Sequence, residues 1–415
     1  MVASTLKIGV GDFSVGLHVV LFTVAWVALP RRSGQAQVRV GRIIGIWASL
    51  LVGHFLLALF TTPCTDLLLK SGVSLVLILL LLGAVGHLAT ATPPVQSLTT
   101  DMKAVVAMVA GALILEVALG RAPGGEGIVR AGGIFPEPSH LALAISPVLV
   151  GLMLAEKFSD QLWGWGGFML MMALSASATL FIMVTLCFVT ALLAKSRTNL
   201  SVSMVARVVL LLTFMVGLVV YTPYRDEFAS RVAGLTQIDA SANVSSLVYV
   251  NGWEMTLQNL QTTQGLGLGF NRMGCNPRPE SDAGALLEVL GVGDLNYNDG
   301  SFIMSKLLSE LGLLGLAFWA FAMLVLARIV FMKSRRPLGR LPADVHAMLV
   351  SGVTVITLGA LIRATNYFSG PFVFGLFCVI FVCAHGQGGA RSQTRRRAVR
   401  KRPAADIQPV GGPNA

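Results

Sequence analysis

Long apolar runs dominate this sequence and limit it to folds that a lipid bilayer can hold. Most of the runs approach the length of about 20 residues that an α-helix needs to cross a hydrocarbon core. Only 12% of the residues are charged, whereas soluble domains carry about 25%. We therefore expect an all-α, polytopic membrane protein of about eleven transmembrane helices, at 13–29, 43–60, 67–89, 104–120, 140–155, 163–176, 178–194, 205–221, 309–332, 345–362 and 371–386.

The segment 164–194 is expected to form two helices. A single helix of that length would measure about 46 Å, which is longer than a hydrocarbon core of about 30 Å. Ser175-Ala-Ser-Ala-Thr179 lies near its middle and is expected to form a tight turn.

Basic residues set the expected orientation. They cluster in the loop 30–42 and in the tail 388–415, and the positive-inside rule places both segments in the cytoplasm. An even number of crossings must separate these two segments, and the split helix provides it. Because the cytoplasmic loop 30–42 follows the first expected span, the N-terminus is expected outside. We attribute the net charge of +11 to the same rule and not to nucleic-acid binding, so we expect no nucleic-acid partner. The helical domain is expected to span 1–387, followed by a disordered tail.

This topology leaves two polar segments on the outer face, the loop 121–139 and the much longer loop 222–300. The longer loop is expected to be partly helical, because Leu247, Val250, Glu254, Leu257 and Gln261 share one face. Asn243 or Ser245 is expected to cap that helix. We therefore expect short helices that lie over the outer opening of the helical domain.

The first motif is Arg130-Ala-Gly-Gly-Ile-Phe-Pro-Glu-Pro-Ser-His140. Two prolines restrict the backbone around Glu137, and Ser139 is expected to cap a helix that begins at His140. One interpretation is a rigid turn in which Glu137 pairs with Arg130. The other is a preorganised site for an anionic substrate and for proton transfer.

The second motif is Gly265-Leu-Gly-Leu-Gly-Phe-Asn-Arg272. Glycines let a backbone approach a ligand and expose its N–H groups, to which Asn271 and Arg272 would add donors. The alternative is a flexible loop between surface helices.

The third motif, Asn296-Tyr-Asn-Asp-Gly-Ser-Phe302, precedes an apolar helix. Asp299 and Ser301 lie where a helix N-terminus favours a capping side chain or an anion. Arg363, at the outer end of the tenth span, is either an interfacial anchor or one of several arginines that bind a diphosphate together.

Three histidines and two cysteines are given simpler interpretations. We expect His18, His54 and His87 to pack or to bridge helices, because no acidic partner lies at a matching depth. Cys64 and Cys275 are both expected outside, where they could form a disulfide, but two free thiols are the preferred interpretation.

Taken together, these motifs resemble the bacterial O-antigen ligase/polymerase superfamily. Phe135–His140 opens a helix after an arginine-bearing outer loop, and Trp253 followed by Gly265–Gly269 occupies a long late outer loop. Asn298-Asp299-Gly-Ser then leads into Leu308–Gly315. The resemblance spans most of the chain.

One departure separates the two branches of the superfamily. Its ligases usually carry a His-Asn pair at the start of the late helix, where this chain has Tyr297-Asn298-Asp299. The resemblance therefore favours polymerases of O-antigen or exopolysaccharide repeat units. It implies a membrane glycosyltransferase of the bacterial inner membrane whose active site faces the periplasm or exterior. The alternatives are a ligase that transfers glycan to a lipid or protein, and a transporter of polysaccharide or lipid-linked oligosaccharide.

The implied reaction uses polyprenyl-diphosphate-linked oligosaccharides as donor and acceptor. A flippase and a chain-length regulator are conceivable partners. Because no carboxylates are spaced for Mg²⁺, we expect neither metal nor other cofactor, and we expect positively charged side chains to neutralise the leaving diphosphate. The expected base is Glu137, with His140 or Asp299 second. The expected substrate-binding residues are Arg130, Arg272, Arg278, Arg363, Asn271 and Asn298.

Overall fold

The computed structural model describes most of the helical part of the chain. It covers residues 7–10, 13–16, 35–61, 67–91, 97–120, 131–135, 137–195, 243–298, 300–331, 341–363 and 366–385, with single positions at 213, 217, 233 and 238. Of the expected features, Arg130, Asp299, His18, Cys64 and the tail 388–415 lie outside these residues, as does most of the eighth expected span.

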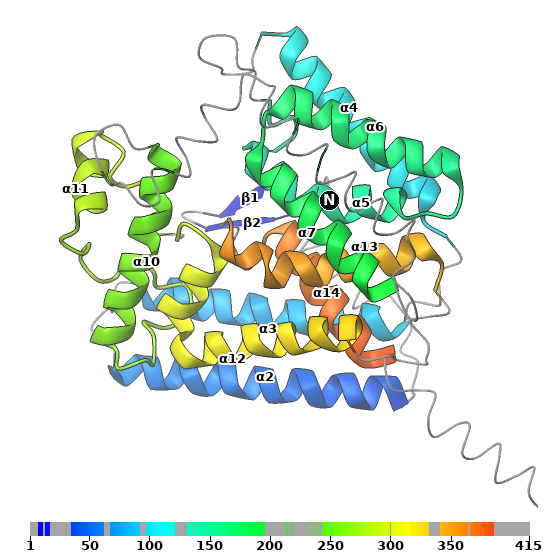
Figure 1. Cartoon of the computed structure of the whole chain (residues 1–415). Helices are drawn as coiled ribbons and strands as arrows, with labels where there is room; N and C mark the ends of the chain where they lie inside the picture. Colours follow the sequence, from blue (N-terminus) through cyan, green and yellow to red (C-terminus); the bar gives the residue numbers. More distant parts are fainter. Residues whose placement is uncertain are drawn as a thin grey trace, which may run out of the picture.

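Helices make up almost all of the described structure (Figure 1). Five of the described helices are long and apolar enough to cross a membrane: α2 (Gln35–Thr61), α3 (Leu68–Ala91), α7 (Ala178–Lys195), α12 (Ile303–Phe331) and Ala343–Leu361, which comprises α13 (Ala343–Thr357) and the short η3 (Gly359–Leu361). Two shorter apolar helices are α5 (Pro138–Met153) and α14 (Gly370–His385). The remaining helices are α4 (Thr99–Ala118), α6 (Phe158–Ser175), α10 (Val244–Thr262) and α11 (Asp282–Val289).

The start of the first expected span is not helical, which corrects the prediction for residues 13–16. Strand β1 (Lys7–Val10) pairs antiparallel with β2 (Phe13–Gly16), and Val10 lies opposite Phe13. Gly11-Asp12, a dipeptide typical of tight hairpin turns, separates the two strands in the sequence. Residues 17–29 lie outside the described part of the chain.

The predicted division of 164–194 into two helices is confirmed. Helix α6 ends at Ser175, and Ala176 adopts a left-handed conformation with φ of 47°. The hydroxyl of Ser177 then accepts the N–H of Leu180 at 3.2 Å and caps α7. This turn brings small hydroxyl side chains to one end of the helical body.

Contacts between segments distant in sequence define the two ends of the body. At one end, called the basic end here, Arg39 donates to the carbonyl of Ala384, and the carboxylate of Asp344 accepts the N–H of Leu98. The opposite end, called the site end, comprises the described residues within 54–61, 131–139, 175–178, 243–310 and 357–369. Helix α5 runs between them through the centre of the body, where every residue from Leu141 to Met153 is buried.

Helices α10 and α11 lie together at the site end (Figure 1). The predicted cap of α10 is confirmed, since the side chain of Asn243 accepts the N–H of Ser245 at 3.0 Å. Helix α10 packs closely on α12 through Gly252, whose carbonyl accepts the hydroxyl of Ser305 at 2.9 Å. Thr256 joins this contact by a hydroxyl–hydroxyl bond of 2.9 Å to Ser305.

The glycine-rich motif packs against a break in α12. Gly312 has φ of 55° and ψ of −131°, which interrupts the helix. Leu268 and Gly269 donate their N–H groups to the carbonyls of Ser309 and Glu310, both at 2.9 Å. A Cβ atom at Gly267 would lie 2.6 Å from the Glu310 carbonyl oxygen. The glycines therefore permit close backbone packing, and the motif is neither a flexible loop nor an array of free N–H groups.

The interpretation of Cys275 as a free thiol is wrong, because Cys275 is disulfide-bonded. Cys187, Cys378 and Cys383 are free, and the chain's remaining cysteine is Cys64. His54 bridges segments as expected, through a bond of 2.8 Å between its Nε2 and the carbonyl of Leu266.

Candidate functional site

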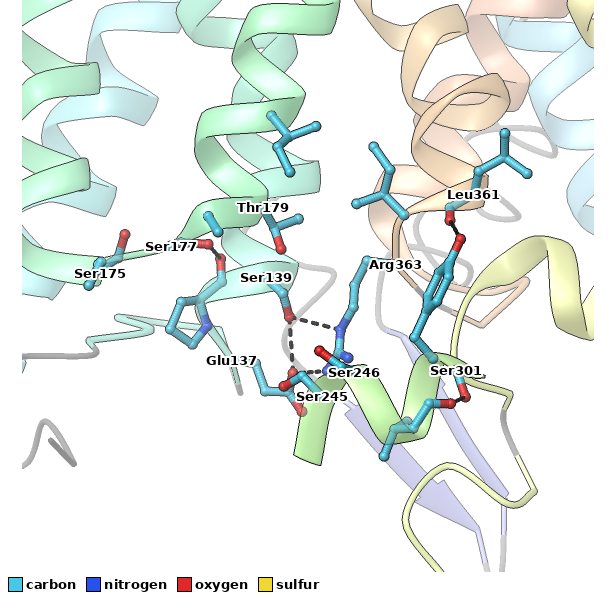
Figure 2. A pocket seen from close by; sticks show the side chains of 17 residues that line it. Glu137, Ser139, Ser175, Ser177, Thr179, Ser245, Ser246, Ser301, Leu361 and Arg363 are labelled. Atoms are coloured by element: carbon cyan, nitrogen blue, oxygen red, sulfur yellow. Dashed lines mark hydrogen bonds and ion pairs between the residues drawn. The ribbon is translucent and has the colours of Figure 1, made fainter. Parts of the chain in front are cut away.

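An open cavity of about 500 Å³ lies at the site end. One wall comes from α5, the α6–α7 turn and η3, and the other comes from the first turns of α10 and the approach to α12 (Figure 2). The polar or charged residues that line it are Glu137, Ser139, Ser175, Ser177, Thr179, Ser245, Ser246, Tyr249, Ser301 and Arg363.

Arg363 forms an ion pair with Glu137 inside this cavity (Figure 2). The Nε of Arg363 also donates to the hydroxyl of Ser139 at 3.1 Å. That hydroxyl in turn donates to the Glu137 carboxylate at 3.0 Å. The three side chains therefore form a closed triangle that fixes the guanidinium by two independent contacts.

This triangle corrects the expected role of Ser139. Helix α5 begins at Pro138 with Glu137 as its N-cap residue, so Ser139 lies inside the helix and binds other side chains instead of capping. Pro is favoured in this first position because its fixed φ suits a helix and its missing N–H costs nothing there. Glu137, which the sequence suggested as a partner of Arg130, is thus paired with Arg363, 226 residues away.

A compact turn before α5 sets the position of Glu137. Phe135 donates its N–H to the carbonyl of Gly132 at 3.1 Å, and Gly133 has φ of +67°, a conformation that side chains disfavour. The N–H of Gly133 is bound by the carboxylate of Glu116 at the end of α4. Two glycines and a neighbouring helix therefore hold this turn in place.

Four helix N-termini converge on the cavity. Pro138 and Ser139 belong to the first turn of α5, Ala178 and Thr179 to that of α7, and Ser245 to that of α10. The fourth is α12, which begins two residues after the cavity-lining Ser301. A helix N-terminus carries partial positive charge and exposes N–H groups. Together with Arg363, this arrangement favours an anionic group within the cavity.

Most of these cavity residues were not predicted to be part of a site. The serines of the α6–α7 turn and of α10 were read as turn and cap residues, because a hydroxyl serves those roles equally well. Tyr249 carried no local signal at all. The feature that could have identified them is their shared position at helix N-termini, and that becomes visible when the helices are placed in space.

Glu137 is ionised more readily than an ordinary glutamate. Burial raises its pKa, but the charges of Arg363 and His140 and the hydrogen bonds from Ser139 and Arg363 outweigh it, so the pKa is lowered. His140, in the first turn of α5, is half-buried and acts on Glu137 through its charge. The carboxylate form of Glu137, which can accept a proton, therefore prevails at neutral pH.

A second cluster of charged residues is buried beside the cavity, around Glu310. The Glu310 carboxylate accepts the N–H groups of Asn271 at 2.8 Å and of Met273 at 3.1 Å. Lys306, one helical turn earlier, pairs with it at 3.3 Å. Burial and the charge of Glu310 raise the pKa of Tyr367 well above its ordinary value. The second and third sequence motifs thus meet here, as parts of the framework behind the cavity.

Arg272 and Asn271 belong to this framework. The side chain of Arg272 is 1% exposed and donates to the carbonyl of Ala58 at 3.3 Å. The amide of Asn271 donates to the hydroxyl of Ser74 on α3 at 2.8 Å. The structure therefore does not bring these two predicted substrate ligands to the cavity, because their side chains tie the glycine-rich loop to α2 and α3.

Arg278 and Asn298 also lie outside the cavity lining. Arg278 pairs with Glu288 and Asp294, each at 3.0 Å, and lies over the ring of Tyr297. The carbonyl of Asn298 accepts Lys306 at 3.4 Å. Of the predicted substrate-binding arginines that the structure describes, Arg363 alone lines the cavity. Within the described residues, no three His, Cys, Asp or Glu side chains are grouped so as to hold a metal ion.

Comparisons with known proteins assign no family. No family model, curated protein or solved structure matches the chain.

Proposed function

We propose that this chain is a polymerase of lipid-linked polysaccharide repeat units. It would transfer a glycan from polyprenyl diphosphate to the non-reducing end of another polyprenyl-diphosphate-linked oligosaccharide. The observation that carries this proposal is the cavity in which Arg363, four helix N-termini and a set of hydroxyl side chains surround one carboxylate. Such a site suits a ligand that combines an anionic group with many hydroxyls, as a sugar diphosphate does.

In the proposed reaction, a hydroxyl oxygen of the acceptor attacks the anomeric carbon of the donor. The bond from that carbon to the diphosphate oxygen breaks, and polyprenyl diphosphate leaves with the bonding electrons. Arg363 and the helix N-termini stabilise the developing negative charge. Glu137, already ionised, takes the proton of the attacking hydroxyl. The cavity hydroxyls orient the sugars.

A small apolar cavity marks a gap between helices against which an isoprenoid tail would lie, although its volume is too small to enclose the tail. It has a volume of about 60 Å³ and is lined by apolar residues of α2, α3, α12 and α14, including Trp47, Leu82, Phe318 and Leu376. Phe270 and Tyr367 also line it, and their rings stack at 4.8 Å. Both come from segments of the site end, so the tail would approach the reaction site from the lipid side.

The proposed orientation puts the site end outside the cell and the basic end in the cytoplasm of a bacterium. The disulfide at Cys275 supports it, since disulfides persist in oxidising compartments such as the periplasm. The positive-inside rule supports it too, because Arg39 and Arg42 lie at the opposite end. A topology of about eleven spans, with the N-terminus outside and residues 13–16 excluded from the first span, is part of this proposal.

The test is glycan laddering in a host that lacks the gene and is complemented with variants. Glu137→Gln and Arg363→Ala are expected to abolish the ladder while protein levels remain normal. Glu288→Gln is the matched control, because Glu288 also pairs with an arginine but lies exposed on α11. A normal ladder from well-expressed Glu137→Gln and Arg363→Ala proteins would refute the proposal.

Purified protein separates the polymerase from its nearest alternative. Supplied with lipid-linked repeat units alone, a polymerase lengthens them, whereas a ligase requires a different lipid or protein acceptor. Lengthened products that carry polyprenyl diphosphate are expected. Transfer that occurs only after a second type of acceptor is added would favour a ligase.

A further inference from the structure

The hydroxyl of Tyr249 links the two walls of the cavity. Tyr249 lies on α10, and its hydroxyl donates to the carbonyl of Leu361, the last residue of η3, at 3.0 Å. Arg363 follows two residues later, and its own N–H bonds to the carbonyl of Gly359 at 3.2 Å. The tyrosine therefore holds the short segment that carries the cavity's arginine (Figure 2, at Leu361).

The ring of Tyr249 is itself held by aromatic packing. Its centroid lies 4.7 Å from that of Phe302, which is fully buried at the start of α12. Trp253, one turn further along α10, also packs on Phe302, with a centroid distance of 4.8 Å. The neighbouring Ser301 hydroxyl donates to the carbonyl of Val248. The position of the Tyr249 hydroxyl is thus set by the contact between α10 and α12.

The segment from 358 to 363 needs such a contact. Helix α13 ends at Thr357, and η3 contains only three residues, so the residues before Arg363 are held by hydrogen bonds of single turns, such as that from the N–H of Leu361 to the carbonyl of Leu358 at 3.2 Å. Short 3₁₀ turns at helix ends have weaker hydrogen-bond geometry than α-helix. On the opposite side, Glu137 and Ser139 hold the guanidinium group. Tyr249 holds the backbone of the same segment through the carbonyl of Leu361.

We propose that Tyr249 is a positioning residue that fixes the Arg363 guanidinium in the cavity by holding the carbonyl of Leu361. Its effect on glycan transfer rests on the proposed function, whereas its effect on the segment 358–363 does not. A misplaced guanidinium would still bind anions but would stabilise the departing diphosphate less well, because such stabilisation depends on geometry.

The first experiment measures the segment directly by amide hydrogen exchange on purified full-length protein. Tyr249→Phe removes the hydroxyl and keeps the ring. We expect faster exchange in peptides that cover 358–363. The matched control is Tyr297→Phe, which removes a similar hydroxyl-to-carbonyl bond of 2.5 Å to Asn276, away from the cavity lining. Unchanged exchange of 358–363 in Tyr249→Phe would overturn the proposal, whatever the activity of the protein.

The second experiment tests whether the effect passes through Arg363. We expect Tyr249→Phe to lower kcat for extension of lipid-linked repeat units by roughly tenfold, with KM changed by less than about twofold. In the Arg363→Lys background, the same substitution should have little further effect, because the group that Tyr249 positions is already lost. Tyr297→Phe should leave kcat within about twofold of the wild type.

The outcomes separate the two proposals. Faster exchange with non-additive kinetics supports the role of Tyr249. Equal, additive losses of kcat in both Arg363 backgrounds would overturn it, since Tyr249 would then act independently of the arginine. If wild-type protein extends no glycan while exchange of 358–363 rises in Tyr249→Phe, the proposed function fails and the positioning of this segment by Tyr249 stands.

Discussion

At the scale of single residues, the triangle of Glu137, Ser139 and Arg363 determines what the cavity can do. The guanidinium has planar, fixed donors, and here one of them binds the carboxylate while another binds the hydroxyl. The remaining donors can meet a ligand. The carboxylate is held as a base and cannot swing away, because Ser139 donates to it as well.

The pH dependence of stability should report this ion pair. The lowered pKa of Glu137 means that its ionised form stabilises the folded state at pH values above the unfolded pKa of about 4.3. That contribution is lost as the pH falls through the lower folded value. In Arg363→Gln, burial is no longer outweighed by the arginine, so the folded pKa rises and the stability lost on acidification should shrink or reverse. Thermal unfolding of both proteins between about pH 3 and 6 is the measurement. Parallel curves would contradict the assignment.

At the scale of secondary structure, the break in α12 is the feature that joins the glycine-rich motif to the helical body. Gly312 leaves the helical conformation, and Leu313 donates its N–H to the carbonyl of Gly265 at 2.9 Å. The last four carbonyls before such a break have no helical partner, and the glycine-rich loop supplies donors to two of them. The loop and the break therefore stabilise each other.

Gly312→Ala should be strongly destabilising. A Cβ atom would overlap the carbonyl oxygen of Gly265, at a φ of 55° that side chains rarely adopt. We expect a loss of at least about 3 kcal/mol in the free energy of unfolding. Gly53→Ala on α2 is the control, because no atom lies within 4 Å of its Cβ position. Chemical denaturation in detergent measures both, and equal stability of the two variants would contradict this role of the break.

The buried pair of Lys306 and Glu310 should behave as a unit. Each side chain is at most 1% exposed, and removing one partner leaves the other charge buried, which costs about 3 kcal/mol or more. We therefore expect Lys306→Met and Glu310→Gln each to lower stability by about that amount. The double variant should lose less than the sum of the two. Additive losses in denaturant unfolding would show that the two charges do not interact.

At the scale of the whole molecule, the disulfide of Cys275 should be measurable in two ways. Without reduction, an alkylating reagent added to denatured protein should modify Cys187, Cys378 and Cys383 but not Cys275. Cys275→Ser should lower stability by about 2–4 kcal/mol, whereas the control Cys383→Ser replaces a free thiol and should change it less. Alkylation of Cys275 before reduction would contradict the assignment.

The helices were predictable because hydropathy and turn chemistry are local properties. Residues 164–194 divide where Ser175–Thr179 indicated, and α10 begins at the cap that Asn243 predicted. The N-terminal hairpin was missed because an apolar run does not by itself distinguish a strand from a helix.

The site was less predictable because its contacts join distant segments. Nothing near Glu137 in the sequence identifies Arg363 as its partner. The glycine-rich motif, with Arg272 at its end, was assigned to ligand binding because glycine permits close approach of any group. In the structure, the group that approaches these glycines is the backbone of α12. Whether a ligand or a helix fills that space depends on tertiary packing.

The long sequence separation within the cavity has a consequence for biosynthesis. Glu137 and its arginine are 226 residues apart, so a ribosome has made most of the protein before both are present. Translation proceeds at roughly 5–20 residues per second, so α5 waits for many seconds before Arg363 has been synthesised. A nascent chain stalled or truncated before α13 contains no complete cavity. The proposed glycan transfer would therefore begin only after α13 and η3 have been inserted.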